Sequence, residues 1–320
     1  MNLSTRSADG APVMARSSSS VRHLLTRALA RCGAVRGRSG FARLGLALGW
    51  LAVAGLAGPS AFAQQRPKFG LDDVVAKAKA LADAPYVAPV SNLPDVFSKM
   101  QFADYQKMQP KRDRFAWMEY KTPFKLAFYH QGMQFNTPVR ISEIVDGAVH
   151  EIPYDSGRFD FADLHFDREA TAKLGWAGFR VVYPINQPGK LDEVMSVLGA
   201  SYFRVLGRGQ RYGLSARGLS IGAGTAAEEF PVFREFWIEQ PAANAERIVI
   251  HTLLDSSVVT GAYRFTIYPD HDTIVDVAAT LFPRRPIEKL GLAPLTSMFF
   301  TGENDRRFFD DFRTELHDSD

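Results

Sequence analysis

The stretch Tyr263-Arg-Phe-Thr-Ile-Tyr-Pro-Asp-His-Asp-Thr-Ile-Val-Asp-Val-Ala-Ala-Thr-Leu281 indicates the fold class of this chain most clearly. Apolar and polar residues alternate with a period of two on both sides of Pro269-Asp-His-Asp272. That period is typical of a strand with one buried face, and proline and aspartate are common in tight turns. The stretch therefore predicts two antiparallel strands joined by a hairpin turn at 269–272.

Further strands are predicted on the N-terminal side of this hairpin. The same alternation covers 124–129, and segments typical of strands cover 233–239 and 247–254. Strands recur roughly every dozen residues with few helical patterns between them, which is the spacing of sandwich proteins. The sequence predicts an all-β fold, a large antiparallel β-sandwich. It has no internal repeat, low-complexity linker or clear domain boundary.

Helical patterns are confined to the region before the first strand. Six apolar residues in 71–82 share one face at a spacing of 3.6 residues. Asp72 and Asp73 stand at the start, where the helix dipole favours anions, and Pro85 follows the end. Shorter helical patches are predicted near 94–100 and 103–108. These helices are expected to pack against the larger β-structure.

Length, composition and charge are those of a globular protein. The 320 residues are 46% hydrophobic and 23% charged, and the chain is long enough to bury a sizeable core. Residues 1–63 hold eight of the 38 basic residues and one of the 35 acidic ones. The remaining 30 basic and 34 acidic residues give a net charge of about −4, which argues against nucleic acid as a partner.

The first 63 residues have the pattern of a secretory signal peptide. An arginine-rich stretch precedes the uncharged apolar segment Leu44–Leu56, and Ala61-Phe-Ala63 follows as a cleavage site. Cleavage after Ala63 would give a mature chain that begins at Gln64, with no membrane span and a periplasmic location. An uncleaved membrane anchor is the alternative.

No metal or cofactor is expected from the sequence. The single cysteine, Cys32, lies in the segment predicted to be removed, and the histidines form no H-x-H or H-E-x-x-H motif. His271 lies between two aspartates, but in the predicted turn. The glycine-rich stretch 207–218 matches neither the dinucleotide-binding fingerprint nor the G-x-S-x-G elbow.

Carboxylates beside aromatic rings are the chemistry that a glycan cleft needs, because acids handle protons and rings stack on sugar faces. A solvated acid or a core ring remains the alternative at each position. The candidate binding residues are Tyr202, Arg211, Tyr212, Glu228 and Trp237.

Several longer runs resemble a known family. They are Lys121-Thr-Pro-Phe-Lys125, Phe128-Tyr-His-Gln-Gly-Met133, Leu198-Gly-Ala-Ser-Tyr-Phe-Arg204, Gly209-Gln-Arg-Tyr-Gly-Leu-Ser-Ala-Arg-Gly218, Glu228-Glu-Phe-Pro231, Phe236-Trp-Ile238, Leu254-Asp-Ser256, Thr260-Gly-Ala-Tyr263 and Leu290-Gly-Leu-Ala-Pro-Leu-Thr-Ser-Met298. Together they resemble the periplasmic glucan biosynthesis family known as MdoG, or OpgG/OpgD, over about residues 69–320. The segment 128–139 is closer to the G-type, whereas the ending Leu316-His-Asp-Ser-Asp320 is closer to the D-type.

The resemblance implies a role in making osmoregulated glucans with a β-1,2-linked glucose backbone. It also implies a mutarotase-like β-sandwich with an extended glucan cleft, followed by a small immunoglobulin-like domain. D-type members are similar to inverting β-1,2-glucan hydrolases, whereas the G-type is required for glucan assembly. Members continue beyond the motif His317-Asp-Ser-Asp320, so residues 64–320 are predicted to be a truncated sandwich domain without the second domain.

Three functions follow from the resemblance and stay open. The chain binds or processes the glucan backbone, or it is an inverting β-1,2-glucan endo-hydrolase, or it is a non-catalytic partner of the inner-membrane glucan synthase. The family's proton donor lies in the His-Asp-Ser-Asp motif, which makes Asp320 or Asp318 the candidate catalytic acid. Val232 stands where hydrolytic members carry an Asp, and this truncated chain is therefore predicted to be inactive.

Overall fold

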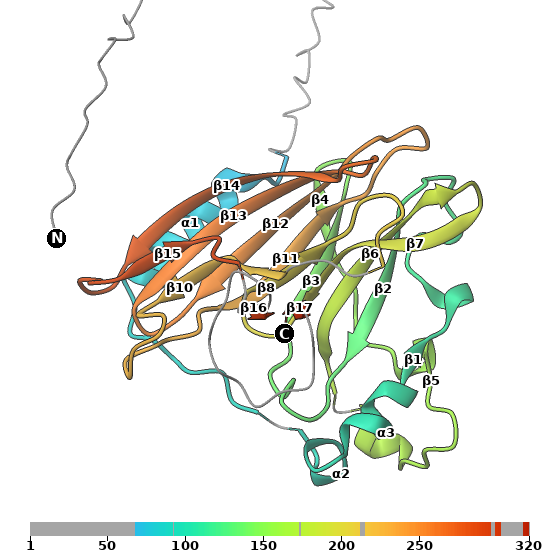
Figure 1. Cartoon of the computed structure of the whole chain (residues 1–320), viewed down its shortest axis with the longest axis horizontal. Helices are drawn as coiled ribbons and strands as arrows, with labels where there is room; N and C mark the ends of the chain where they lie inside the picture. Colours follow the sequence, from blue (N-terminus) through green and yellow to red (C-terminus); the bar gives the residue numbers. More distant parts are fainter. Residues whose placement is uncertain are drawn as a thin grey trace, which may run out of the picture. The chain divides into compact units, whose positions relative to one another are not determined.

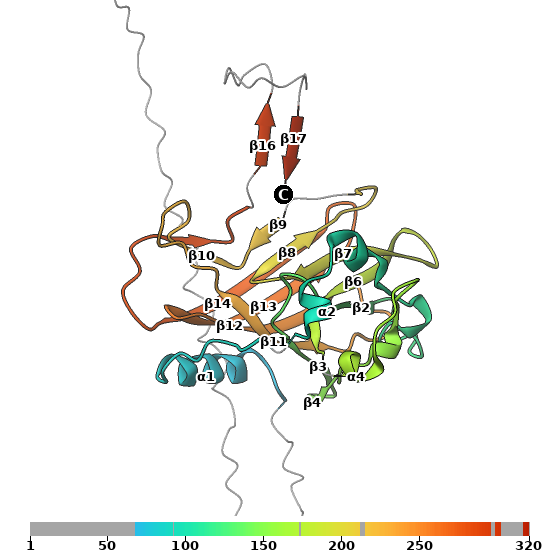
Figure 2. The same ribbon diagram turned by 90° about the horizontal axis from the view of Figure 1, so that it is seen from below.

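The computed structural model describes residues 68–91, 93–172, 174–211, 215–295, 298–301 and 316–319. Two β-sheets and one helix, α1, form three successive layers (Figures 1 and 2). The predicted signal peptide and the candidate residues Tyr212 and Asp320 lie outside the described residues.

The larger sheet has six strands in the order β14-β13-β12-β11-β3-β4. Its strands are β3 (Arg140–Val145), β4 (Ala148–Glu151), β11 (Val232–Glu239), β12 (Ile248–Asp255), β13 (Val259–Tyr268) and β14 (Ile274–Pro283). The neighbours are antiparallel except for β11 and β3, which run parallel. A parallel pair needs a long crossover, and here the chain between β3 and β11 supplies four of the five strands of the second sheet.

The second sheet has five antiparallel strands in the order β2-β6-β7-β8-β9. They are β2 (Lys125–His130), β6 (Trp176–Gln187), β7 (Lys190–Leu198), β8 (Tyr202–Val205) and β9 (Ser215–Arg217). Two-stranded ladders complete the β-structure: β1 (Gln109–Pro110) with β5 (Phe159–Asp160), β10 (Leu219–Ile221) with β15 (Leu290–Leu292), and β16 (Met298–Thr301) with β17 (Leu316–Ser319).

The core lies between the two large sheets, where aromatic rings from each sheet meet. Phe179 of β6 packs edge-on against Phe236 of β11 at 5.1 Å between ring centroids, and Phe203 of β8 does the same against Phe265 of β13. Such pairs add about 0.5–1.5 kcal/mol each beyond the area they bury. The apolar residues that recur with a period of two in the sequence thus form one buried face on each sheet.

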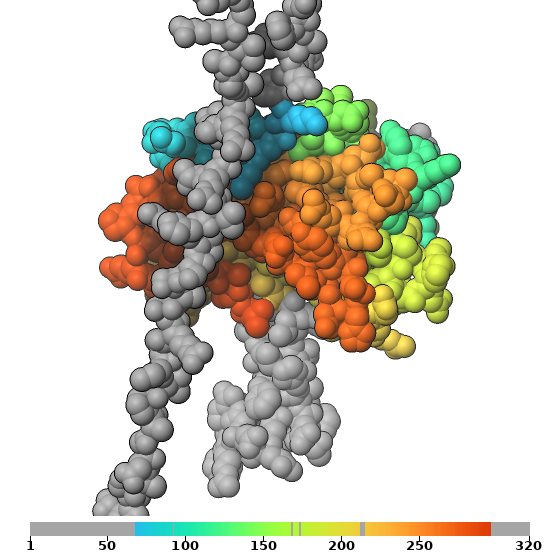
Figure 3. All heavy atoms as spheres, turned by 90° about the horizontal axis from the view of Figure 1, so that it is seen from above, coloured from blue at the N-terminus to red at the C-terminus, as the bar shows by residue number. Residues whose placement is uncertain are grey.

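Helix α1 (Leu71–Ala82) covers the other face of the six-stranded sheet. Figure 3 shows this blue helix against the orange strands. Val74 and Ala78, on the side of the helix that faces the sheet, are fully buried. At the start of the helix, the Asp73 carboxylate accepts a hydrogen bond from the Gly70 N–H at 2.8 Å. Lys77 reaches from the helix to the sheet, where its ammonium lies 2.6 Å from the Glu235 carboxylate.

Short helices pack beside the five-stranded sheet. They are α2 (Asp95–Ser98), α3 (Phe102–Lys107) and α4 (Arg168–Ala172), with single 3-10 turns at Arg112–Arg114 and Ser156–Arg158. Phe97, Met108 and Leu174 form their own small core. None of the helices in the described residues is long and apolar enough to cross a membrane.

The predicted β-sandwich with short N-terminal helices is confirmed. The hairpin is present, since Tyr268 pairs with Ile274 across the turn at 269–272. Helix α1 has the predicted bounds, and strands cover the other predicted segments. The parallel pair of β3 and β11 differs from the purely antiparallel expectation. Val277 is exposed because β14 is the edge strand of its sheet.

Candidate functional site

The outer face of the five-stranded sheet carries polar and aromatic side chains, and we call it the polar face. Its residues alternate with the core residues Phe128, Phe179, Val197, Phe203 and Ala216. One row crosses the sheet as Ala127, Arg180, Ser196, Arg204 and Ser215, each opposite the next. In the neighbouring row, Tyr129 pairs with Gly178, Gly178 with Leu198, and Tyr202 with Arg217.

Hydrogen bonds and ion pairs fix the middle of the polar face. The Tyr129 hydroxyl lies 2.8 Å from the Ser196 hydroxyl, and the Arg180 guanidinium lies 5.1 Å from the centre of the Tyr129 ring. Arg204 donates to the Glu193 carboxylate at 2.5 Å. Burial raises the pKa of Tyr129, so its hydroxyl stays protonated and can act as donor or acceptor.

Arg217 organises one end of the polar face. Its guanidinium donates to the Glu228 carboxylate at 2.6 Å and lies 5.4 Å from the Tyr202 ring centre and 4.6 Å from the Phe230 ring centre. The hydrogen bond from Arg217 holds the pKa of Glu228 below its usual value. Phe230 keeps 47% of its surface exposed, so a charged pair and an accessible ring stand side by side.

A hollow of about 200 Å³ adjoins this end, and we call it the Arg234 hollow. Gly199 has φ +74°, a conformation that favours glycine, and a β-carbon there would lie 3.1 Å from the Phe135 ring. Phe135 also packs against Tyr105 at 5.5 Å between ring centroids. The lining residues are Gln134, Phe135, Asn136, Thr137, Pro138, Val139, Ala177, Val197, Gly199, Ala200, Val232, Phe233, Arg234 and Phe236.

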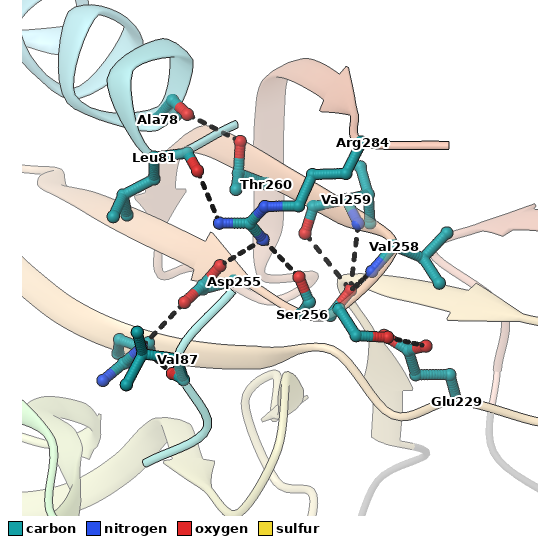
Figure 4. Close-up of polar contacts among 12 residues, drawn as sticks. Ala78, Leu81, Val87, Glu229, Asp255, Ser256, Val258, Val259, Thr260 and Arg284 are labelled. Atoms are coloured by element: carbon teal, nitrogen blue, oxygen red, sulfur yellow. Dashed lines mark hydrogen bonds and ion pairs between the residues drawn. The ribbon is translucent and has the colours of Figure 1, made fainter. Parts of the chain in front are cut away.

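A buried charge network anchors Arg234, and Figure 4 shows Asp255 and Arg284, which form its centre. The Asp255 carboxylate, 2% exposed, accepts hydrogen bonds from Arg234 and from Arg284, each at 2.7 Å. Arg284 also donates to the carbonyl oxygens of Ser256 and, at 2.6 Å, of Leu81. Because Leu81 lies in the last turn of α1, the network connects that helix to the Arg234 hollow.

The structure brings together two of the predicted binding residues. Tyr202 and Glu228 both contact Arg217. Arg211 is exposed after β8, and Tyr212 lies outside the described residues. Asp318 pairs with Phe299 in the ladder of β16 and β17, and Asp320 lies outside the described residues. The catalytic assignment of these two aspartates therefore stays a prediction.

Trp237 is not part of this surface. It is 5% exposed, packs against Phe69 at 5.2 Å between ring centroids, and lies in the small core beneath α1. Lys77 covers the ring at 5.1 Å from its centre. Trp237 lies on the outer face of the central strand β11, where Phe69, which precedes α1, and Lys77 of α1 cover its ring. The core interpretation is therefore the right one for this tryptophan.

Sequence reasoning missed most of the polar face. Tyr129, Arg180, Ser196, Arg204 and Arg217 were not among the candidates. An arginine that interrupts the otherwise apolar run Ala177-Gly-Phe-Arg-Val-Val182 was an available signal. No group of three or more potential metal-binding side chains is found within the described residues.

Comparisons with known proteins agree on one family. The family model described as "Periplasmic glucan biosynthesis protein, MdoG" matches residues 69–320. A "Glucans biosynthesis protein G" from Pseudomonas paraeruginosa is 56% identical over 252 residues, which cover 78% of this chain and 48% of the relative. The protein of the same description from Sodalis glossinidius is 54% identical over 253 residues, 79% of this chain and 48% of the relative. The chain thus spans about half the length of these relatives.

Proposed function

The chain belongs to the MdoG family of periplasmic glucan biosynthesis proteins, and we propose that it acts in the periplasm by holding a glucan chain on its polar face. The glucan is the one with the β-1,2-linked backbone that the family resemblance implies. The binding surface runs from Tyr129 across the sheet to Arg217, with the Arg234 hollow beside it.

The two polar rows are the observation that carries this proposal. The rows have residues on all five strands, and Arg180, Arg204 and Tyr202 keep part of their surface exposed, so they provide an extended surface rather than a closed pocket. Hydroxyl, guanidinium and carboxylate groups are donors and acceptors for sugar hydroxyls, and the rings of Tyr202 and Phe230 are suited to stacking on sugar faces. A long neutral polymer needs many such contacts in a line.

Calorimetric titration with a linear β-1,2-glucan tests the proposal. Arg217→Ala removes the cation that joins Tyr202 and Glu228, and we expect it to weaken binding about tenfold, or ~1.4 kcal/mol. Arg112→Ala is the matched control, because Arg112 is exposed in the 3-10 turn Arg112–Arg114, outside the polar face. Unchanged affinity in Arg217→Ala, or an equal loss in the control, would count against the polar face.

Hydrolysis is the less supported alternative for this chain. An inverting hydrolase needs an acid and a base on opposite sides of the bond. Val232 lines the Arg234 hollow and supplies no proton acceptor there. We therefore expect no new reducing ends when the chain is incubated with linear β-1,2-glucan. Robust release of reducing ends would restore the hydrolase proposal, with Asp318 or Asp320 as its acid.

A role as partner of a membrane glucan synthase is supported by exposed leucines. Leu292 and Leu295 are 68% and 63% exposed, and Leu290 lies on the same strand as Leu292. Apolar side chains exposed together often mark a protein contact. We expect Leu290→Asp combined with Leu292→Asp to abolish co-purification with the synthase and to leave glucan binding intact; Leu295 is kept, because it bridges to Ala216 beside Arg217. Retained co-purification would remove this support.

A further inference from the structure

A second hollow lies on the opposite side of the sandwich. It measures about 580 Å³, stands at the turn that joins β11 to β12, and we call it the Tyr268 hollow. Glu239, Val249 and Tyr268 reach it from the six-stranded sheet, on the side away from the core. The lining residues are Glu239, Gln240, Pro241, Ala242, Asn244, Ala245, Glu246, Arg247, Ile248, Val249 and Tyr268.

The polar groups of this hollow include a donor without a partner among the described residues. The Gln240 side-chain nitrogen is buried and has no hydrogen-bond partner in the described part of the chain. Buried amide groups are nearly always paired, so an unpaired one in the wall of a hollow points to a ligand or water that accepts from it. Unlike the Gln240 amide, the Glu239 carboxylate has a partner within the protein, since it lies 3.1 Å from the ring nitrogen Nε2 of His251.

The balance of charges and rings defines the class of ligand. Two carboxylates, Glu239 and Glu246, outnumber the single guanidinium of Arg247, which disfavours an anion. Asn244 and Gln240 add amide donors and acceptors, and Tyr268 adds an aromatic ring. Donors and acceptors in similar number around a ring suit a neutral, polyhydroxylated ligand.

We propose that the Tyr268 hollow is a second glucan-binding site, which holds a short stretch of the polymer while the polar face holds another. This inference rests on the proposed function, because the glucan is the polyhydroxylated ligand that it supplies. Both sheets and the core separate the two sites. A short oligosaccharide fills each site separately, whereas a long chain can pass around the sheet edge and occupy both, which raises its apparent affinity.

Calorimetric titration of the full chain with a short linear β-1,2-glucan oligosaccharide tests this proposal. We expect two molecules to bind per chain. Tyr268→Ala should reduce that number to one, and Tyr202→Ala should weaken the other site about tenfold. Tyr120→Ala, at an exposed ring outside both sites, is the matched control and should leave both sites unchanged. Arg247→Ser, in an exposed loop, is a second variant for the case that Tyr268→Ala unfolds more easily.

The outcomes separate this inference from the proposed function. A single site that Tyr202→Ala weakens and that Tyr268→Ala and Arg247→Ser leave intact would overturn the second site alone. A single site that responds only to Tyr268→Ala or Arg247→Ser would overturn the polar face and keep the second site. Absence of binding to the wild-type chain would overturn both.

Discussion

The two outer faces of the sandwich have opposite characters. The outer face of the six-stranded sheet is covered along α1, which buries Trp237, Leu253 and Ala262. The polar face of the five-stranded sheet instead presents Arg180 and Arg204, with 25% and 28% of their side chains exposed. Both faces carry aromatic rings. An aromatic residue beside an acid thus indicates a binding surface only where no helix covers its strand.

The largest expected effect in this comparison follows the loss of Trp237. Trp237→Ala removes a buried ring beneath α1 and should lower the free energy of unfolding by about 3–5 kcal/mol. Denaturant unfolding measures the loss. The affinity of the folded protein for glucan should stay unchanged, since the ring is 5% exposed. A stable variant with weakened glucan binding would place Trp237 in the binding surface after all.

The charge network behind the Arg234 hollow should be nearly as sensitive. Asp255→Asn leaves the guanidinium groups of Arg234 and Arg284 without their counterion, which costs about 3–5 kcal/mol at a buried site. Asp270→Asn is the control, because its pair with Arg208 is exposed and should contribute at most about 1 kcal/mol. Similar unfolding midpoints for the two variants would show that burial does not set the strength of this network.

His130 should make stability depend on pH. Its Nδ1 lies 2.5 Å from the Gln131 carbonyl oxygen, and burial lowers its pKa from 6.5 to about 4. Between these pH values the unfolded chain binds a proton that the folded chain does not. The contribution of His130 to stability is therefore complete above about pH 6.5, falls by about 3 kcal/mol toward pH 4, and is constant below.

His130→Phe should remove that part of the pH dependence, because a phenyl ring does not titrate. Denaturant unfolding at a series of pH values measures the slope for both proteins. The ring of His130 packs among Phe97, Phe159 and Phe161, so phenylalanine suits the surroundings. Identical slopes for wild type and variant would assign the pH dependence to other groups.

Tyr202→Ala gives the smallest effect on stability and sharpens the contrast with Trp237. The ring is half-buried and lies on the polar face, so we expect a loss in the free energy of unfolding below about 1 kcal/mol. Glucan affinity should fall about tenfold, or ~1.4 kcal/mol. Titration and unfolding of the same preparation give both numbers. A large loss of stability with unchanged affinity would make Tyr202 a packing residue.

The sequence predicted the individual helices and strands better than the contacts that each of them makes with other parts of the chain. Helix α1 was predictable because its apolar stripe and the acids at its start act within one segment. The hairpin of β13 and β14 was predictable because the turn and the alternation are adjacent. The burial of Trp237 depends on which strand lies beneath α1, and the contacts of Arg217 depend on Glu228 and on β8. Such pairings join distant segments, and local patterns do not encode them.

Hydrogen–deuterium exchange of the full chain, with and without linear β-1,2-glucan, tests the central claim most directly. We predict slower exchange of backbone amides in β8, in β9 and in the segment 224–230, which lie at the Arg217 end of the polar face. Amides of α1 should exchange at the same rate with and without glucan. Protection confined to α1, or no protection in β8 and β9, would contradict the assignment of glucan binding to the polar face.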